Sequence, residues 1–579
     1  MSVITTRVAD CQDCHRCLRH CPVKAISFRL GQAHIIDERC IACGCCTLVC
    51  PQQAKVIHSD LLRAKDFLAE GRKVALSVAP SFPAAFPRQV VDSFGSMVRA
   101  LGFSWVEETA VGAQVVAREY KELLEGRKEP LISACCPAVV NLIEKHYPAL
   151  IPYLAPSFSP MATHGLMLKK RYGSDTKVVF VGPCIAKIDE VRRREVAGIV
   201  DAVITFPELE KWFEEAAIAP MTVSNHNRLY GGGSLSARSF PVEGGVLQAA
   251  GIARDLGSRV LAVNGLDECL ATFDDLAAGS INPRFIEAMV CSGGCVGGPA
   301  MPQGTSAAAN RLKVEAYFDR ANKGKTSCEL PEEMFRGLQL TRSFHDRRQK
   351  LPEPTPEDIA AILARTGKTR PADEANCGGC GYDSCREKAY AVYQGWAEEE
   401  MCIPYMKSKI SSLAVAIVNS TSSAVIVTDS NLIVQEVNPR ALELFALDAD
   451  AVTGQPLGNF FDPNNFAMAW EEQETIVDKR VVYPDRERVT LQTILPIKDY
   501  SLIVGIINDI SNLERDKEEA RQMKQEALVR AEQVITRQMK AAQEIASLMG
   551  ETTAETKATL HQLIELARGK EDVGNAIGS

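Results

Sequence analysis

The chain has 579 residues, of which 46% are hydrophobic and 24% charged, a composition typical of globular proteins. It is too long for one core, so we expect about three to five domains. The formal net charge of −8 argues against nucleic acid as a main partner, and no apolar run reaches the roughly 18–20 residues that would span a membrane. Because the first residues lack the apolar stretch of a secretory signal, the 20 cysteines predict metal or redox use in a reducing cytoplasm rather than disulfides.

Residues 1–62 contain two cysteine runs of the form C-x2-C-x2-C-x3-C-P. This is the bacterial two-cluster ferredoxin pattern, in which the fourth cysteine of each run ligates the other cluster. One predicted 4Fe–4S cluster therefore has the ligands Cys11, Cys14, Cys17 and Cys50. The second has the ligands Cys40, Cys43, Cys46 and Cys21, with zinc as the alternative metal at either site. The additional Cys45 is predicted to be a small buried residue.

Residues 63–350 have the pattern of an α/β domain. Apolar, β-rich runs at Val74–Pro80, Lys177–Pro183 and 201–206 alternate with helix-like stretches, and each run ends in a turn that carries a functional-looking residue. Open α/β sheets bind their ligands at the carboxyl ends of the strands, so we expect the site at these turns.

Five cysteines of this region are dispersed over three segments. The segments are LISACCPAVV with Cys135 and Cys136, VGPCIAKIDE with Cys184, and EAMVCSGGCVGGPAMP with Cys291 and Cys295. Three loops that converge would suit a large buried cofactor. The three segments resemble the signature motifs of the iron-only (FeFe) hydrogenases, and with the ferredoxin runs the resemblance covers roughly residues 1–305. It implies an H-cluster, which is a 4Fe–4S cubane joined through a cysteine sulfur to a two-iron unit with CO, cyanide and an azadithiolate.

The resemblance also implies a role for each matching residue. The cubane ligands would be Cys136, Cys184, Cys291 and Cys295, and Cys295 would also bridge to the two-iron unit. Cys135 would relay protons to the bridging amine, and Lys187 would hydrogen-bond a cyanide. Pro80 and Ser81 would contact the other cyanide, and Met289 would pack beside the two-iron unit. The alternatives are an inert Cys135 thiol, a surface Lys187, a purely ion-paired Glu190, and packing roles for Cys269 and Cys328.

Some positions depart from the family's pattern. Gly182 stands where the family usually has methionine, which we expect to open space beside the cofactor. The family's proton path has two glutamates and a serine; Ser159 and Glu108 are plausible matches, but the second glutamate falls on Val111, which cannot carry protons. The third motif ends in GGPAMP rather than in a run of glycines. These departures predict slow turnover.

Residues 351–408 contain a fourth cysteine set with the spacing C-x2-C-x4-C-x16-C. Its members are Cys377, Cys380, Cys385 and Cys402. Neighbouring glycines allow the backbone to wrap closely around a cluster. The segment resembles the small 4Fe–4S domain of certain corrinoid-linked proteins and sensory hydrogenases. It predicts a third accessory cluster, with zinc as the alternative.

The remaining chain has a regulatory character. Residues 409–512 resemble a PAS domain, with a hairpin-like start and a short helix in 419–447 and later strands in VTLQTILPI and YSLIVGIINDIS. They contain no histidine or cysteine, which argues against a histidine-ligated haem or a cysteinyl flavin. Residues 513–579 have an apolar stripe typical of a long, self-pairing helix: Leu528, Ala531, Ile535, Met539, Ala542, Ile545 and Met549. We expect Gly550 to interrupt this helix, a capping box from Thr552 to Glu555, and a disordered tail.

The sequence thus predicts a multidomain α/β and α+β protein. Its parts would be a two-cluster ferredoxin domain, a two-lobed α/β H-cluster domain, a small 4Fe–4S domain, a PAS domain and a C-terminal coiled coil. The favoured function is slow, reversible H2 oxidation used for sensing, with a ferredoxin-type electron partner, a kinase or phosphatase as signalling partner, and homodimerisation. The alternatives are a catabolic hydrogenase whose PAS domain docks an electron partner, and a non-catalytic, cubane-only protein of cluster assembly.

Overall fold

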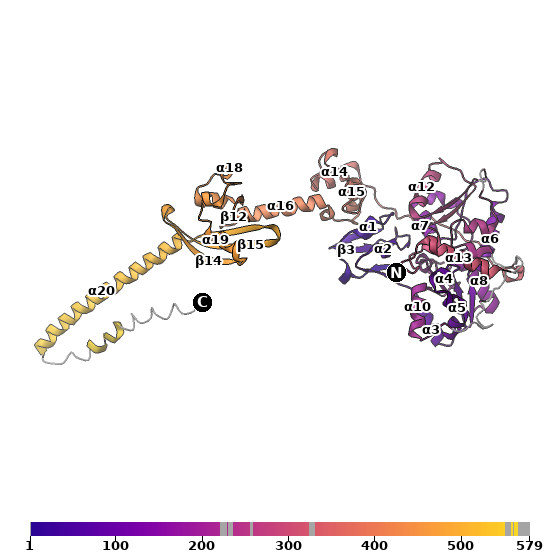
Figure 1. Cartoon of the computed structure of the whole chain (residues 1–579), viewed down its shortest axis with the longest axis horizontal. Coiled ribbons are helices and arrows are strands. Elements are labelled where there is room, and N and C mark those ends of the chain that lie inside the picture. Colours follow the sequence, from indigo (N-terminus) through magenta and orange to yellow (C-terminus); the bar gives the residue numbers. More distant parts are fainter. Residues whose placement is uncertain are drawn as a thin grey trace. The chain divides into compact units, whose positions relative to one another are not determined.

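The chain folds as two compact units, Met1–Met406 and Lys407–Ser579 (Figure 1). The structure is a computed structural model that describes residues 2–220, 229, 236–254, 257, 259–323, 330–549, 557–559 and 561–564. Within the described helices, none combines the length and the apolar character that crossing a membrane requires.

The two cysteine runs lie in a small part built from short strands and helices. Its elements are β1 (Ile4–Thr6), α1 (Arg16–Arg19), β2 (Ile26–Arg29), β3 (Gln32–Ile35), α2 (Cys45–Val49) and β4 (Lys55–Ile57). Strand β1 pairs antiparallel with β4, and β2 pairs antiparallel with β3. Each run leads into a helix whose first residue is preceded by a left-handed residue, His15 or Gly44, so the backbone turns sharply around the thiols.

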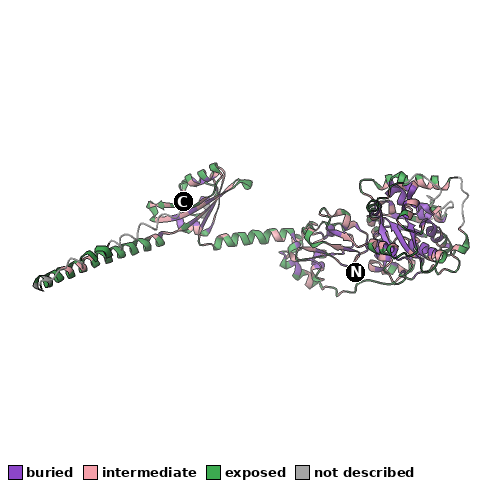
Figure 2. Cartoon of the chain, turned by 90° about the horizontal axis from the view of Figure 1, so that it is seen from below, coloured by how far each residue is buried: buried purple, intermediate pink, exposed green. Residues whose placement is uncertain are grey.

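Two parallel sheets form the centre of the first unit. One has the order β6-β5-β8-β9, and the other has the order β10-β11-β7. Their strands are β5 (Val74–Val78), β6 (Trp105–Glu108), β7 (Leu131–Ile132), β8 (Lys177–Gly182), β9 (Ala202–Thr205), β10 (Val260–Asn264) and β11 (Phe285–Met289). All residues of β5 and β11 are buried, as expected for parallel strands covered on both faces (Figure 2). The predicted strands at 74–80, 177–183 and 201–206 are confirmed.

Helices cover these sheets and connect their strands. They are α3 (Leu61–Ala69), α4 (Phe82–Ala85), α5 (Arg88–Ala100), α6 (Ala110–Leu124), α7 (Pro137–His146), α8 (Pro160–Tyr172), α9 (Ala186–Glu190), α10 (Phe206–Glu215), α11 (Gly245–Ala250), α12 (Leu266–Ala277) and α13 (Ala307–Asn322). The chain leaves the carboxyl end of β5 towards β6 and the carboxyl end of the neighbouring β8 towards β9, so the two connections run in opposite directions. Such a switch point opens a crevice for ligands.

The fourth cysteine set lies on two further helices, α14 (Pro356–Arg365) and α15 (Cys385–Tyr393). This segment packs directly on the ferredoxin-like part. The Phe28 N–H donates to the Trp396 carbonyl at 2.9 Å, and Lys24 forms an ion pair with Asp383 at 3.2 Å. A side chain at Gly381 would meet Leu18 at 3.0 Å, so the two segments are in close contact between Cys17 and Cys380.

The second unit contains a five-stranded antiparallel sheet of order β13-β12-β16-β15-β14. Its elements are α16 (Ile403–Ser420), which begins in the first unit, β12 (Ala424–Asp429), β13 (Val434–Val437), α17 (Pro439–Phe445), α18 (Ala449–Val452), α19 (Asn464–Glu472), β14 (Ile476–Tyr483), β15 (Arg488–Ile497) and β16 (Leu502–Asp509). The sheet has its own core, which includes Ile426, Phe445 and Ile503. The predicted hairpin, short helix and later strands are confirmed.

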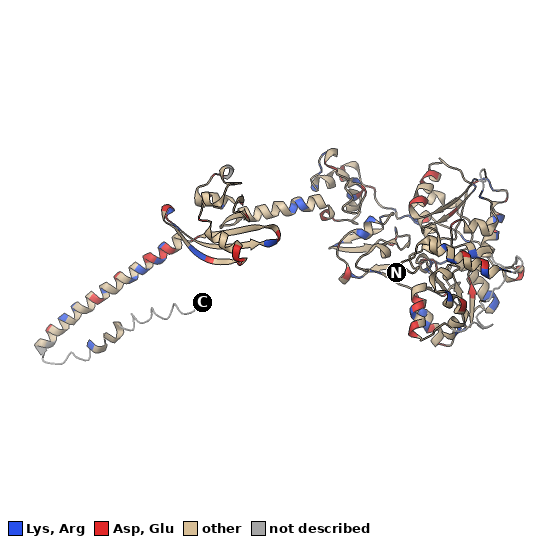
Figure 3. Ribbon diagram, in the orientation of Figure 1, with Lys and Arg blue, Asp and Glu red and all other residues tan. Residues whose placement is uncertain are grey.

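The helix expected near Leu513 is present as α20 (Ser511–Met549). Both charges alternate along it, and most of its described side chains are exposed (Figures 2 and 3). Its pairing with a second chain remains a prediction. Gly550, Thr552, Glu555 and the terminal tail lie outside the described residues, as does Cys328.

Candidate active site

Three cysteine-bearing loops converge, as predicted. They follow β7, β8 and β11, each at the carboxyl end of a parallel strand, and β8 belongs to a different sheet from the other two. The loops contribute Cys136, Cys184, Cys291 and Cys295 to the wall of one cavity. The four predicted cubane ligands are thus together, at the junction of the two sheets.

A second cavity, about 80 Å³ in volume, adjoins the first. The two share Cys136, Cys184, Cys295 and Met289 in their walls. Only the second is lined by Cys135 and Lys187 and by Pro80 and Ser81, which follow β5. Every predicted H-cluster contact outside the cubane ligands therefore lines one cavity.

The donor set of the two cavities fits the two-part cofactor. Five cysteines line the first cavity, and the four other than Cys43 supply the number of thiols that a cubane needs. In the second, the buried Ser81 hydroxyl has no hydrogen-bond partner among the described residues, and it lies where the resemblance requires a polar contact. Burial raises the pKa of Cys184 to about 12 and that of Cys291 and Cys295 well above its ordinary value, so these thiols need a cation to ionise.

Lys187 is held in place by a buried carboxylate. Its Nζ lies 2.8 Å from Glu190 Oε2 and donates to the Cys135 carbonyl at 3.5 Å. Arg342 donates to the other oxygen of Glu190 at 3.1 Å. Burial alone would raise the pKa of Glu190, but Lys187 and Arg342 hold it below its usual range. Glu190 is thus an ion-pair partner that aims Lys187 along the cavity wall, and Lys187 is not a surface residue.

The two predicted proton-path residues have separate partners. Ser159 caps α8 by accepting from Ala162 N–H and donates to Glu190 at 3.1 Å. Glu108 accepts two hydrogen bonds from Arg238, both at 2.8 Å, and a third from the Tyr317 hydroxyl at 3.0 Å. Among the described side chains, no hydrogen bond joins Glu108 to Ser159.

Two expectations about neighbouring positions need correction. Gly182 does not open space, because a side chain there would meet the Phe180 ring at 2.7 Å, and this ring lines the second cavity. Cys45 is half-buried rather than buried, and its thiol is hydrogen-bonded to Cys43. Cys269 is buried and donates to the Met289 carbonyl at 3.6 Å, in agreement with its predicted packing role.

The sequence reasoning missed two carboxylates, the buried Glu287 and the half-buried Glu119. Glu287, in β11, accepts from the N–H groups of Gly244 and Leu247 at 2.8 and 3.0 Å, and burial raises its pKa to about 7. Glu119, on α6, has one carboxylate oxygen without a described partner, and burial and Glu122 raise its pKa to about 7. A charged residue inside the apolar strand sequence FIEAM was the signal for Glu287. For Glu119 no local signal stands out.

Two pairs of cysteines from different runs share contacts, as the predicted crossed arrangement requires, although the ligand sets themselves stay a prediction. Cys14 and Cys50 both donate to Gln52 Oε1 at 3.9 Å, although they belong to different runs. Burial raises the pKa of Cys40 to about 11, and the nearby Cys21 thiol contributes to the rise. Cys43 also lines the cavity of the four cubane cysteines, so the second set directly adjoins the predicted H-cluster.

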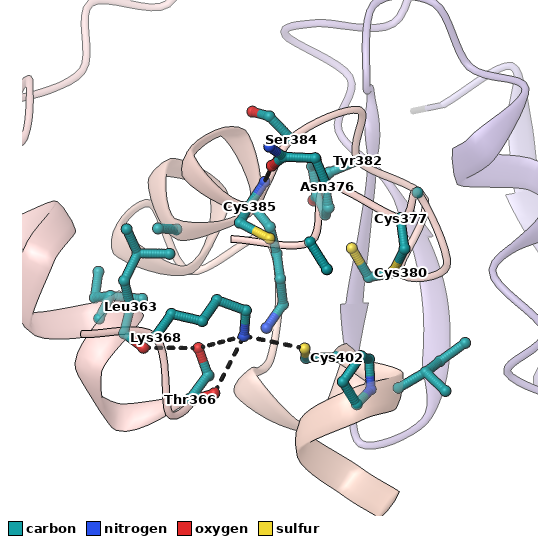
Figure 4. A pocket seen from close by; sticks show the side chains of 17 residues that line it. Leu363, Thr366, Lys368, Asn376, Cys377, Cys380, Tyr382, Ser384, Cys385 and Cys402 are labelled. Atoms are coloured by element: carbon teal, nitrogen blue, oxygen red, sulfur yellow. Dashed lines mark hydrogen bonds between the residues drawn. The ribbon is translucent and has the colours of Figure 1, made fainter. Parts of the chain in front are cut away.

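The fourth set lines a cavity of its own (Figure 4). Cys377, Cys380, Cys385 and Cys402 all contribute to its wall, and Lys368 Nζ donates to Cys402 Sγ at 3.3 Å. Across the described residues, no three or more His, Cys, Asp or Glu side chains are arranged to hold a single metal ion.

Comparisons with protein families match three parts of the chain. Residues 72–299 match the family described as iron only hydrogenase large subunit, C-terminal domain; residues 373–404 match an Fe-S cluster family; and residues 413–499 match the PAS fold. The HydA1 [FeFe]-hydrogenase structure from Chlamydomonas reinhardtii aligns with 50% of this chain and 100% of its own, with 22% identity and a TM-score of 0.38. The family assignment rests on sequence matches.

Three curated relatives illustrate these matches. The periplasmic [Fe] hydrogenase large subunit of Nitratidesulfovibrio vulgaris is 30% identical over 53% of this chain and 89% of its own length. The NADP-reducing hydrogenase subunit HndD of Solidesulfovibrio fructosivorans is 28% identical over 47% of this chain, which spans only 57% of that protein. The cytosolic Fe-S cluster assembly factor NAR1 of Yarrowia lipolytica is 29% identical over 32% of this chain and 45% of its own length. The match to the Nitratidesulfovibrio vulgaris subunit extends over 89% of that protein at 30% identity. Together with its cysteine loops and paired cavities, this match shows that the chain belongs to the iron-only hydrogenase family.

Proposed function

We propose that this chain catalyses slow, reversible H2 oxidation at an H-cluster and that it serves as a sensor whose output passes through the PAS domain. When bound, the cofactor supplies the interconversion of H2 with two protons and two electrons. The observation that carries the proposal is the second cavity, which a protein that holds only a cubane would not require. Its wall combines a thiol, a cation and an unpartnered hydroxyl, at Cys135, Lys187 and Ser81.

In this proposal the residues divide the work by position. Cys136, Cys184, Cys291 and Cys295 would hold the cubane, and Cys295 would also hold the two-iron unit. Cys135 holds and passes a proton at its Sγ, Lys187 donates to an anionic diatomic ligand, and Ser81 donates from the opposite loop. Pro80 and Met289 exclude water from the cavity.

Electrons would leave through the accessory clusters. Cys43 lies in the wall of the cubane cavity, and the residue after Cys17, Leu18, packs against Gly381, the residue after Cys380. This order supports a route from the H-cluster through the ferredoxin-like clusters to the set at 377–402. We propose three accessory 4Fe–4S clusters and a ferredoxin-type electron partner.

The sensory role rests on the attached PAS domain and on the closed proton path. Glu108 is engaged by Arg238 and Tyr317, and Val111 lies fully buried in an apolar cluster, which supports slow turnover. A kinase or phosphatase is the proposed recipient, and α20 is the proposed homodimer contact. The proposed location is the cytoplasm. A catabolic enzyme would instead turn over fast, so the rate separates these two roles.

The match to the assembly factor NAR1 supports a second candidate, a cubane-only protein without H2 chemistry. Infrared spectra of the full chain, produced together with hydrogenase maturation proteins and recorded before and after H2, distinguish the two. Sharp CO and cyanide bands that shift under H2 are expected. Their absence, with iron and sulfide sufficient for four cubanes, would favour the cubane-only protein.

A further inference from the structure

A chain of buried polar groups begins in the wall of the second cavity. Thr109 lines that cavity, and its Oγ1 lies 2.7 Å from the hydroxyl of Ser77 in β5. The Ser77 hydroxyl also meets His164 Nδ1 at 2.8 Å. The other ring nitrogen, His164 Nε2, faces Glu107 Oε2 at 3.4 Å, the longest link of the chain.

The far end of this chain reaches the surface. The second oxygen of Glu107 accepts from the Tyr172 hydroxyl at 2.5 Å and from Arg171 at 3.1 Å. The side chain of Arg171 is 45% exposed, whereas that of His164 is fully buried. Ser77 and Glu107 are partners on neighbouring parallel strands, so the hydrogen-bond network runs between one face of the sheet and α8, from the cavity to the surface.

A purely structural role explains this network of hydrogen-bonded side chains poorly. Ser77 is the one polar residue in the buried strand VALSV, and His164 and Glu107 bring two ionisable groups into the core. Apolar residues would pack these positions without the cost of desolvating a carboxylate and an imidazole. The network is linear rather than closed, and its ends are a cavity and the surface.

We infer that Thr109, Ser77, His164 and Glu107 form a proton path between the second cavity and solvent. The inference rests on the proposed function. The path would supply the exit for protons that the apolar Val111 and the Arg238-bound Glu108 do not provide. In the oxidising direction a proton from the cavity binds Thr109 Oγ1, whose own proton passes to Ser77. Ser77 passes its proton to His164 Nδ1, and His164 releases one from Nε2 to Glu107.

For the proton to leave, the hydrogen bond between Glu107 and Tyr172 reverses: the protonated carboxyl group donates to the Tyr172 oxygen as the hydroxyl gives its own proton to water. Each step forms one O–H or N–H bond and breaks another, and no electron moves along the path. At rest Glu107 is a carboxylate: burial alone would raise its pKa, but His164, Tyr172 and Arg171 hold it below the usual range. Its negative charge stabilises the imidazolium that forms as the proton passes.

Single substitutions that remove one relay group test the path. His164→Gln keeps a polar side chain but cannot exchange protons between two ring nitrogens, and Thr109→Val keeps the shape but removes the hydroxyl. Both should lower H2 oxidation about 10²-fold, with CO and cyanide bands and iron content unchanged. The matched control is Thr163→Val, on the same helix as His164, whose buried hydroxyl has no described partner. Its rate should stay within about twofold.

If His164→Gln does not fold, Tyr172→Phe tests the outer end. The phenyl ring keeps the stack on Trp105, at 4.2 Å between centroids, and loses only the hydroxyl. Turnover should fall with an increased solvent isotope effect. Unchanged rates in Thr109→Val and Tyr172→Phe would overturn the inference. So would a loss of turnover in Glu119→Gln while the variants of the proposed path keep theirs, since protons would then leave along α6.

A second readout is independent of turnover. In the full chain with 15N-labelled histidine, the ring N–H signal of His164 is assigned by its loss in His164→Gln. Although the ring is fully buried, its proton should exchange with D2O rapidly and should become protected in Tyr172→Phe but not in Thr163→Val. A protected signal in the parent would overturn the path. Rapid exchange without CO or cyanide bands would instead refute the proposed function and leave the path intact.

Discussion

At the residue scale, surroundings give two glutamates of the hydrogenase domain opposite properties. Glu190 lies between Lys187 and Arg342, which lower its pKa. Glu119 has no cationic partner in the described residues and faces Glu122, so burial and the like charge raise its pKa to about 7. The first carboxylate is fixed in one ionised state, whereas the second changes its charge near neutral pH.

Glu119 makes folding stability depend on pH in a defined direction. Its folded pKa lies above the ordinary value of 4.5, so the folded state binds protons more tightly, and stability falls as pH rises from about 4.5 to 7. Glu119→Gln removes this penalty. In thermal unfolding, the free energy of unfolding of the variant should equal that of the parent at pH 5 and exceed it by on the order of 1 kcal/mol at pH 8.5. An equal difference at both pH values would contradict the pKa assignment.

Cys135 is the residue on which turnover should depend most. Cys135→Ala removes the only titratable thiol in the second cavity that is not a predicted cubane ligand, and it should lower H2 turnover at least about 10²-fold. Iron content should not change. The matched control is Cys269→Ala, a buried thiol outside the cavity walls, which should retain turnover. Equal rates in both variants would show that Cys135 is not the relay.

At the element scale, the end of β8 shows packing that the motif alone did not reveal. The Phe180 ring lies where a side chain at 182 would extend, 2.7 Å from an added Cβ, and it forms part of the cavity wall. Gly182→Ala should therefore displace the ring, destabilise the fold by about 1–3 kcal/mol and shift the CO and cyanide bands. Adding Phe180→Leu should recover part of the stability. A stable Gly182→Ala with unchanged bands would mean that the ring moves freely.

The strands, the cysteine loops and the PAS sheet could be predicted because their signals are local. Val74–Val78 is a continuous apolar run, and the cysteine spacings are fixed over a few residues. The pairing of Arg342 with Glu190 and of Arg238 with Glu108 could not be predicted, because each joins residues more than 100 positions apart. These pairs decide which carboxylates are free to move protons, so the proton route was the part that the sequence left open.

At the scale of the whole molecule, α20 is the predicted contact between two copies. Its apolar stripe has little else to pack against, since side chains such as Leu528 and Ile545 are 43% and 58% exposed. A chain that ends before Leu513 should be monomeric in light scattering after gel filtration, with somewhat less than half the mass of the full-length dimer. A truncated protein that remains dimeric would place the contact elsewhere.

Cys402 is the residue immediately before α16, and its carbonyl accepts from Met406 N–H at 2.8 Å, within the first turn. The free N–H groups at a helix start favour negative charge, and a 4Fe–4S cluster gains one negative charge on reduction. Helix formation therefore makes reduction easier, and by thermodynamic reciprocity reduction makes the helix more stable. If the proposed cluster binds at residues 377–402, its reduction should therefore stabilise residues 403–420, which should become more resistant to protease under dithionite than in air-oxidised protein.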